Sequence, residues 1–185
     1  MSLPGTFFMR WRVRLGYPLA AVVLWFSHPV PRSVLLGGLI GALGLCLRTY
    51  AAGCLHKQEI LTVNGPYAYT RNPLYLGSSI LALGAAIAMQ SWISASLLLL
   101  YFAVFYSIVM RREETELRAR HSSVFEEYAR AVPLFLPRLR PARLAEGSPG
   151  AFSFAQYKKN HEWQAAFGFL LLLAGLLLIW HFRKG

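Results

Sequence analysis

Charged residues are scarce in this sequence. They make up 15% of its 185 residues, whereas soluble domains usually carry about 25%. Hydrophobic residues make up 56%, and the mean hydropathy is +0.42. This balance excludes an ordinary soluble globule. It indicates an integral membrane protein with a single domain covering residues 1–185.

Cysteines and acidic residues are also few. Cys46 and Cys54 both lie in an apolar stretch, which favours reduced thiols and excludes a disulfide framework. The five histidines are scattered without zinc spacing, so no metal site is expected. Eight acidic residues oppose 19 basic ones, which gives a net charge of +11. Because no nucleic-acid motif accompanies this charge, an anionic membrane surface is the expected partner and nucleic acid is not.

Five apolar segments approach the length of about 20 residues that crosses a bilayer. They cover residues 13–27, 34–55, 74–89, 92–110 and 163–180. The first follows Arg10 and Arg12 and has Arg14 at its edge, as the apolar part of a signal peptide follows a basic start. Pro29 and Pro31 end it without a small-residue cleavage site, so we expect it to remain as a helix. The fold class predicted is an all-α bundle of about five transmembrane helices.

The basic residues predict the orientation of this bundle. With a cytoplasmic N-terminus, the cytoplasmic segments are 1–14, 48–73 and 111–162, and they hold 16 of the 19 Lys and Arg residues. The positive-inside rule therefore predicts that the N-terminus lies in the cytoplasm. Residues 111–140 are expected to form a cytosolic amphipathic segment, with a short helix over 124–131. That helix either rests on the membrane surface or covers a site as a lid. No obligate protein partner is evident.

Two features of the second segment concern packing. Gly37 and Gly41 form a small-xxx-small pair, which predicts a close approach by another helix. Arg48 lies late in the same segment. It either reaches toward the membrane surface or faces a polar cavity.

Residues 64–78 carry the first pattern with chemical meaning. Asn64-Gly65-Pro66 is a turn signal, and Asn72 followed by Pro73 predicts an N-cap and a first helical residue. A helix starting here at the membrane surface would offer free N–H groups to an anion such as a carboxylate. Aromatic faces are added by Tyr67, Tyr69 and Tyr75. The alternative is an interfacial helix start with an aromatic belt.

Residues 111–117 continue the fourth helix and carry the second pattern. Glu114 and Glu116 each have an arginine four residues later, so both fit a solvated helix with i,i+4 ion pairs. Glu113 has Leu117 at that position and extends the apolar stripe of the helix. A carboxylate there is expected to face a partner or a ligand.

Taken in order, these patterns resemble the superfamily of isoprenylcysteine carboxyl methyltransferases and phospholipid methyltransferases. The shared order is Gly-Pro-Tyr, Arg-(His/Asn)-Pro-x-Tyr-x-Gly, a helical hairpin, Glu-Glu-x-x-Leu, a tyrosine and Val-Pro. The matching residues are 65–67, 71–77, 113–117, Tyr128 and 132–133. The resemblance covers about residues 50–137, and the remaining helices match by hydropathy alone.

The resemblance implies S-adenosylmethionine as cofactor. It also implies a site at the cytosolic face, open to the cytosol for the cofactor and to the bilayer for a lipophilic acceptor. The cofactor-binding residues it implies are Glu59, Ile60, Leu61, Thr62, Tyr67, Asn72, Pro73, Leu74, Tyr75, Glu113 and Glu114. Arg71, Tyr75 and Glu113 are the candidate catalytic residues. The candidates for removing a proton from an amine acceptor are His56, Glu59, Arg71 and Tyr75.

Two departures bear on the acceptor. Prenylcysteine enzymes usually have His where this chain has Asn72. They also carry an arginine near the position of Val109, where it meets the acceptor carboxylate. Both departures favour a phospholipid amine, whereas carboxyl and thiol methylation remain the alternatives.

Two other classes of function are consistent with the apolar helices. A membrane oxidoreductase of the sterol-reductase kind would bind a nicotinamide cofactor. A non-catalytic lipid-binding membrane protein would bind no cofactor and would tolerate Glu113→Ala.

Overall fold

The computed structural model describes residues 4–56, 61–143 and 151–184. Its elements are α1 (Pro4–Trp25), α2 (Pro31–Cys54), the 3₁₀ helix η1 (Gly65–Ala68), α3 (Pro73–Met89), α4 (Trp92–Ala131), α5 (Phe154–Lys159) and α6 (Trp163–Lys184). No strand occurs among these described residues. The all-α fold class is therefore confirmed, and α5 is a short helix that the sequence pattern did not predict.

Each predicted membrane segment coincides with a helix. Three helical segments are long and apolar enough to cross a membrane: α2, the first 30 residues of α4 (Trp92–His121), and α6. Arg14–Trp25 in α1 and the 17-residue α3 are shorter apolar helices. At 1.5 Å per residue, α3 is about 26 Å long. The membrane bundle is thus confirmed, and the total of five spans stays a prediction.

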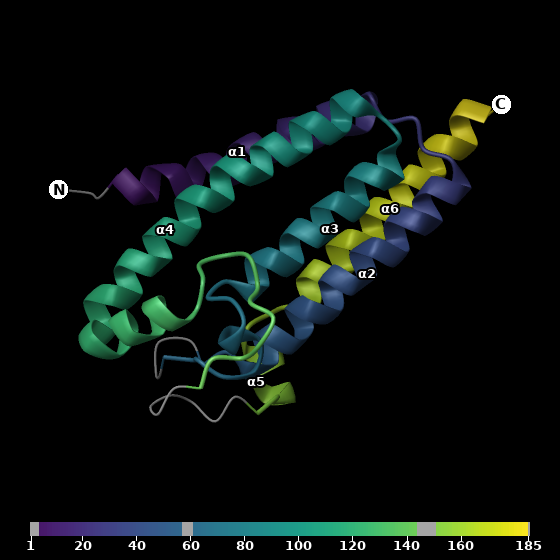
Figure 1. Cartoon of the computed structure of the whole chain (residues 1–185). Helices are drawn as coiled ribbons and strands as arrows, with labels where there is room; N and C mark the ends of the chain where they lie inside the picture. Colours follow the sequence, from purple (N-terminus) through teal and green to yellow (C-terminus); the bar gives the residue numbers. More distant parts are fainter. Residues whose placement is uncertain (1–3, 57–60, 144–150, 185) are drawn as a thin grey trace.

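The helix predicted over 124–131 is not a separate element. It forms the last turns of α4, which runs for 40 residues without interruption. Figure 1 shows these turns bending back toward the loops at one end of the bundle. Arg118 and Glu126 hold the bend with an ion pair of 2.6 Å.

Glycines bring α2 and α3 into close contact. A Cβ atom on Gly44 would lie 2.5 Å from the carbonyl oxygen of Gly77, so no side chain fits there. Gly37 meets Gly84 of α3 in the same way. Gly41 faces the ring of Phe169 on α6. The close approach predicted from Gly37 and Gly41 is confirmed, and it involves two partner helices.

Buried serine hydroxyls link the helices at the end of the bundle where α3 turns into α4. The Ser33 hydroxyl donates to the carbonyl of Ala88 at 3.0 Å, and the Ser94 hydroxyl donates to the carbonyl of Val23 at 2.7 Å. Gln90 adopts a left-handed conformation with φ of 48° and turns the chain from α3 into α4. The loops and the short helices η1 and α5 gather at the other end (Figure 1).

Candidate functional site

Residues 132–142, called the strap here, cross the segment that leads into α3. Hydrogen bonds attach the strap to residues 68–71. They run from Arg71 N to Pro133 O (3.0 Å), from the Thr70 hydroxyl to Phe135 O (2.8 Å), from Arg138 N to Tyr69 O (3.0 Å) and from Ala142 N to Ala68 O (2.9 Å). The strap therefore holds η1 and the start of α3 in one position.

The end of α4 packs against residues 61–67, which include the start of η1. Phe125, Tyr128 and Val132 are fully buried against Leu61 and Val63. The Tyr128 hydroxyl donates a hydrogen bond of 2.8 Å to the carbonyl of Tyr67. The helical segment predicted over 124–131 thus packs onto the candidate site, and its position at a membrane surface stays a prediction.

The helix start at α3 is placed as predicted, with one correction. Asn72 occupies the N-cap position and Pro73 is the first helical residue. The Asn72 side chain makes no cap hydrogen bond and instead donates to Leu134 O on the strap at 2.9 Å. Because this side chain is turned away, it does not cover the N–H groups of the first turn of α3.

Tyr75 and Glu113 meet between α3 and α4. The Tyr75 hydroxyl donates a hydrogen bond of 2.7 Å to Glu113 Oε1. The Tyr75 ring packs edge-on against Tyr106, with centroids 5.1 Å apart. Glu113 therefore has the polar partner expected for it, although its side chain is exposed.

Glu114 pairs with Arg71, also across the two helices. Arg71 Nη1 lies 2.5 Å from Glu114 Oε1, and both side chains are less than one-fifth exposed. Arg118 is a more distant partner of the same carboxylate, at 3.7 Å. The i,i+4 pairing predicted for Glu116 is wrong in direction. Glu116 pairs with Arg112, four residues earlier on the same face of α4, with 2.9 Å between Arg112 Nε and Glu116 Oε1.

Among the described residues, two buried donors in this region have no hydrogen-bond partner. They are the hydroxyl of Tyr67 and Nε of Arg71. The Tyr67 side chain is only 6% exposed. Burial raises the pKa of Tyr67 well above its usual value, and the neighbouring phenol of Tyr128 and carboxylate of Glu113 add to the shift. Tyr67 is therefore a neutral phenol at physiological pH, and a bound acceptor group would satisfy it.

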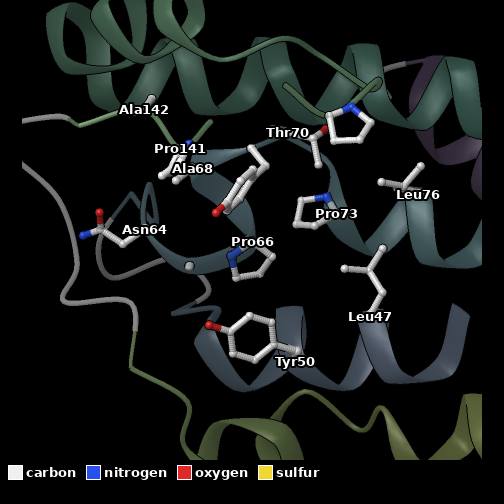
Figure 2. Close-up of a pocket in the computed structure, with 13 residues that line it drawn as sticks. Leu47, Tyr50, Asn64, Pro66, Ala68, Thr70, Pro73, Leu76, Pro141 and Ala142 are labelled. Carbon is white, nitrogen blue, oxygen red and sulfur yellow. The ribbon is translucent and has the colours of Figure 1, made fainter. Parts of the chain in front are cut away.

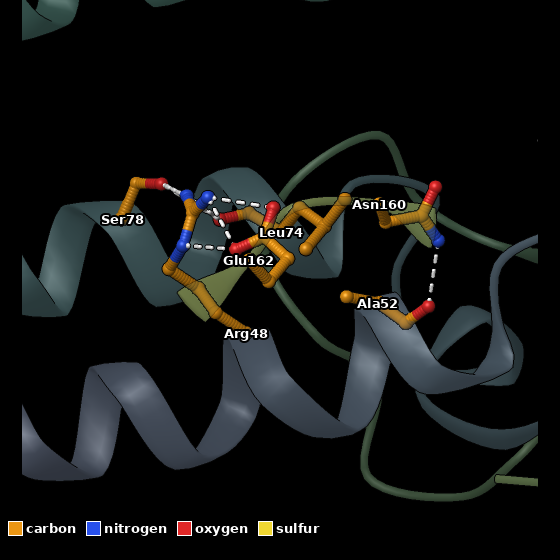
Figure 3. A network of polar contacts seen from close by, with 6 residues as sticks. All are labelled: Arg48, Ala52, Leu74, Ser78, Asn160 and Glu162. Atoms are coloured by element: carbon orange, nitrogen blue, oxygen red, sulfur yellow. Dashed lines mark hydrogen bonds and ion pairs between the residues drawn. The ribbon is translucent and has the colours of Figure 1, made fainter. Parts of the chain in front are cut away.

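Arg48 faces a polar cluster that joins three helices (Figure 3). Its guanidinium binds both carboxylate oxygens of Glu162, with the shortest distance at 2.7 Å. It also donates to Leu74 O in the first turn of α3 and to the Ser78 hydroxyl. Arg48 thus lies against polar partners within the protein, and the choice between the membrane surface and a polar cavity stays a prediction.

Asn160 fastens the segment before α6 to the end of α2. Its amide donates to Ala52 O at 2.8 Å and to Leu55 O at 3.1 Å, in addition to the bond of 3.3 Å that Ala52 O accepts from Leu55 N. Through Asn160 and Glu162, the start of α6 is therefore tied to α2 and to the start of α3. The sequence did not single out either residue.

The other predicted site residues have the following places. Leu61 and Thr62 are buried, and the Thr62 hydroxyl accepts from His56 N at 3.2 Å. The ring of His56 turns toward the carbonyl of Cys54, at 3.1 Å. Leu74 contributes its carbonyl to the Arg48 cluster. Glu59 and Ile60 lie outside the described residues.

A pocket of about 660 Å³ opens between the end of α2, η1 and the strap (Figure 2). Of the described residues that line it, Pro73 alone belongs to the predicted cofactor set. The described part of the chain holds no group of three or more His, Cys, Asp or Glu side chains placed to bind a metal ion.

Comparison with known proteins identifies relatives for most of the chain. Residues 38–122 match the model of the phospholipid methyltransferase family. The nickel-cobalt-cadmium resistance protein NccN of Alcaligenes xylosoxydans xylosoxydans is 32% identical over 138 residues, which are 70% of this chain and 63% of that protein. The cobalt-zinc-cadmium resistance protein CzcN of Cupriavidus metallidurans is 32% identical over 138 residues, 70% of this chain and 62% of that protein. The chain thus spans less than two thirds of these two relatives.

A third relative carries the name of an enzyme. The protein-S-isoprenylcysteine O-methyltransferase of Schizosaccharomyces pombe is 33% identical over 82 residues, which are 44% of this chain and 35% of that enzyme. No solved structure matches the chain. The matched residues 38–122 contain the start of α3 and the Tyr75–Glu113 pair, and both matches support the resemblance to the superfamily of membrane methyltransferases that includes the phospholipid and isoprenylcysteine methyltransferases.

Proposed function

We propose that the protein is a methyltransferase that uses S-adenosylmethionine to methylate a lipophilic acceptor in the membrane. The observation that carries this proposal is the Tyr75–Glu113 pair beside the N-terminus of α3, where the Asn72 side chain makes no cap hydrogen bond. A helix N-terminus attracts a carboxylate, and a glutamate accepts hydrogen bonds from hydroxyl or ammonium groups. S-Adenosylmethionine presents groups of both kinds.

The unpaired hydroxyl of Tyr67 supports the fit of such a ligand. A buried donor without a partner costs about 1–3 kcal/mol, and an acceptor atom on a bound cofactor would remove that cost. We assign Tyr67, Tyr75, Glu113 and the first turn of α3 to cofactor binding. When bound, S-adenosylmethionine supplies an activated methyl group on a sulfonium. The chain's own residues then align the two reactants and exclude water.

Amine methylation is the favoured reaction. Arg71 pairs with Glu114 and Arg48 pairs with Glu162, so an acceptor carboxylate would compete with a carboxylate of the chain at either arginine. Val109 also offers no charge where the prenylcysteine enzymes have an arginine. An amine must lose a proton as the new bond to carbon forms. Among the candidate bases, Tyr75 is hydrogen-bonded to the carboxylate of Glu113, which can accept a proton.

Titration calorimetry with the purified protein tests the cofactor. S-Adenosylmethionine and S-adenosylhomocysteine are expected to bind saturably, and Glu113→Gln is expected to weaken both. Glu116→Gln is the matched control, because Glu116 lies on the same helix in an exposed pair with Arg112. Equal effects of the two substitutions would reject the assignment of Glu113. Absence of binding by a folded protein would reject the proposal and redirect the search to nicotinamide cofactors.

A methyl-transfer assay tests the acceptor. The protein is given methyl-labelled cofactor and one acceptor at a time. The acceptors are phosphatidylethanolamine, a prenylcysteine and an alkyl thiol, each in its own vesicle preparation. Transfer to the lipid amine alone is expected. We further propose that the N-terminus and the cofactor site face the cytoplasm, which reporter fusions at the two termini would test.

A further inference from the structure

Most residues that line the pocket between α2, η1 and the strap lie outside the set assigned to the cofactor. Its volume of about 660 Å³ falls in the range of about 300–1,000 Å³ found for small-molecule sites. Tyr75 and Glu113 do not appear among its described lining residues. The pocket is therefore a second candidate site, next to the one assigned to the cofactor.

The pocket has an apolar end and a polar end. Figure 2 shows Leu47 and Leu76 at one end, and Asn64 and Ala142 at the other. Tyr50 also lines it and is half exposed. Tyrosines with an apolar ring and a polar tip are typical of the boundary between hydrocarbon and headgroups. The gradient matches that of a lipid, with chains at one end and a headgroup at the other.

The apolar end continues a surface that faces acyl chains. Leu36, Ile40, Leu43, Leu47 and Tyr50 follow one another at steps of three and four residues, so they share one face of α2. Leu36 and Leu43 are more than half exposed, in a helix long and apolar enough to cross a membrane. An acyl chain lying on this face of α2 would reach the pocket at Leu47.

Exposed leucines and arginines lie on the strap and directly after it. Leu136 and Leu139 are 73% and 99% exposed, which is unusual for leucines unless a membrane or a partner covers them. Arg140 and Arg143 are exposed and flank the lining residues Pro141 and Ala142. Neither arginine forms an ion pair with a carboxylate in the described part of the chain. Exposed leucines beside arginines are typical of segments that dip into an anionic interface.

We propose that this pocket binds one phospholipid, with an acyl chain against Leu47 and Leu76 and the phosphate beside Arg140 and Arg143. The hydrogen bond from Ala142 N to Ala68 O holds this part of the strap against the pocket, so the two arginines stay near its polar end. This lipid site shares Pro73 and Leu76, in the first turn of α3, with the site assigned to the cofactor, and its other described lining residues lie outside that set.

Photolabelling in nanodiscs tests the lipid site. The protein is placed in phosphatidylcholine nanodiscs that contain a small fraction of phosphatidylglycerol with a diazirine on its acyl chain. After irradiation, the labelled peptides are identified by mass spectrometry. Label is expected to concentrate on the peptides containing Leu47 and Leu76. An even spread of label over all apolar helices would overturn the proposal.

Three variants make the result specific. Leu47→Trp fills the pocket and is expected to remove the concentrated label, whereas Leu36→Trp, on the same face but away from the pocket, is expected to keep it. Arg140→Gln and Arg143→Gln should each reduce the label about five-fold, since a basic residue near an anionic lipid contributes about one such factor. Arg130→Gln removes the same charge from an exposed site on α4 and is the control.

Each alternative occupant has its own signature. If a second copy of the chain covers the pocket, Leu47→Trp would change the oligomeric state and not the lipid label, which would overturn the proposal. Equal loss of label in Arg130→Gln would show a general charge effect and would overturn the phosphate assignment.

Because the arginines are exposed on a loop, their substitution is not expected to affect folding. This keeps the test valid if Leu47→Trp is unstable. Cofactor binding measured in parallel is expected to be unchanged in the arginine variants, so a failure here is distinguishable from failure of the methyltransferase proposal.

Discussion

Tyr75 and Glu113 lie 38 residues apart in the sequence and are joined by a hydrogen bond of 2.7 Å. One is in the first turn of α3, and the other is in α4, three residues after the predicted apolar segment 92–110. The bond therefore fixes the relative rotation of the two helices at the end where the loops gather. It also orients the carboxylate of Glu113, which is otherwise exposed.

Removing this hydrogen bond should weaken cofactor binding more than folding. Tyr75→Phe keeps the ring that packs on Tyr106 but leaves Glu113 without the phenol, which is worth about 0.5–1.5 kcal/mol. We expect the affinity for S-adenosylhomocysteine to fall about five-fold. Tyr106→Phe is the matched control, and calorimetry on both variants is the measurement. An equal loss of affinity in the control would reject the orienting role of Tyr75.

The two neighbouring glutamates on α4 should differ in their effect on stability. Glu114→Gln breaks a largely buried pair with Arg71 and should lower the free energy of unfolding by about 1.5–3 kcal/mol. Glu116→Gln breaks an exposed pair with Arg112 and should cost less than about 1 kcal/mol. Thermal unfolding in detergent measures both variants. Similar melting temperatures for the two would contradict the structural role assigned to Glu114.

The sequence predicted most of the fold because membrane helices follow from local composition. The apolar segments located all the long helices, and the Asn72-Pro73 pair located the start of α3. The exception within these helices is α4. Its charged residues 111–120 separate two apolar patterns, and the sequence shows no breaker between them to indicate whether the helix stops or bends.

The polar contacts of the site were predictable only in part. Helical spacing isolated Glu113 correctly as a carboxylate that needs a partner, but spacing within one helix cannot find a tyrosine on another. The same holds for Arg48 and Glu162, which are 114 residues apart, and for Asn72, whose side chain binds the strap in place of its own helix. Such long-range partners depend on tertiary packing, which overrides the local preference for a cap or an i,i+4 pair.

Close packing of α2 on α3 gives a prediction about glycine. A Cβ on Gly44 would lie 2.5 Å from Gly77 O and 2.8 Å from Leu81 N, both backbone atoms that cannot move aside. Gly44→Ala should therefore destabilise the protein by about 1–3 kcal/mol. Gly168→Ala on α6 is the control, since a Cβ there meets nothing within 4 Å. Thermal unfolding of the two variants should differ clearly, and equal stability would contradict the observed approach of α2 and α3.

Tyr67 should separate stability from cofactor binding. Its buried hydroxyl has no partner in the described part of the chain, so Tyr67→Phe removes an unsatisfied donor and should stabilise the cofactor-free protein by about 1 kcal/mol or more. If the hydroxyl serves the cofactor, the same variant should bind S-adenosylhomocysteine more weakly. The exposed Tyr17→Phe is the control and should change neither property. A variant that loses stability without losing affinity would show that the hydroxyl has a structural partner instead.

The same phenols predict how stability depends on pH. Burial raises the pKa of Tyr128 and of Tyr67 in the folded protein, while Arg71 partly opposes the shift at Tyr128. In the unfolded chain both tyrosines ionise near pH 10. Their contribution to stability is therefore complete below about pH 10 and is lost as the pH rises further, because the unfolded state then releases protons that the folded state retains. We expect the melting temperature to fall steeply above that pH. The fall should be shallower in Tyr67→Phe, which lacks one ionisable phenol, whereas Tyr17→Phe should follow the wild-type curve.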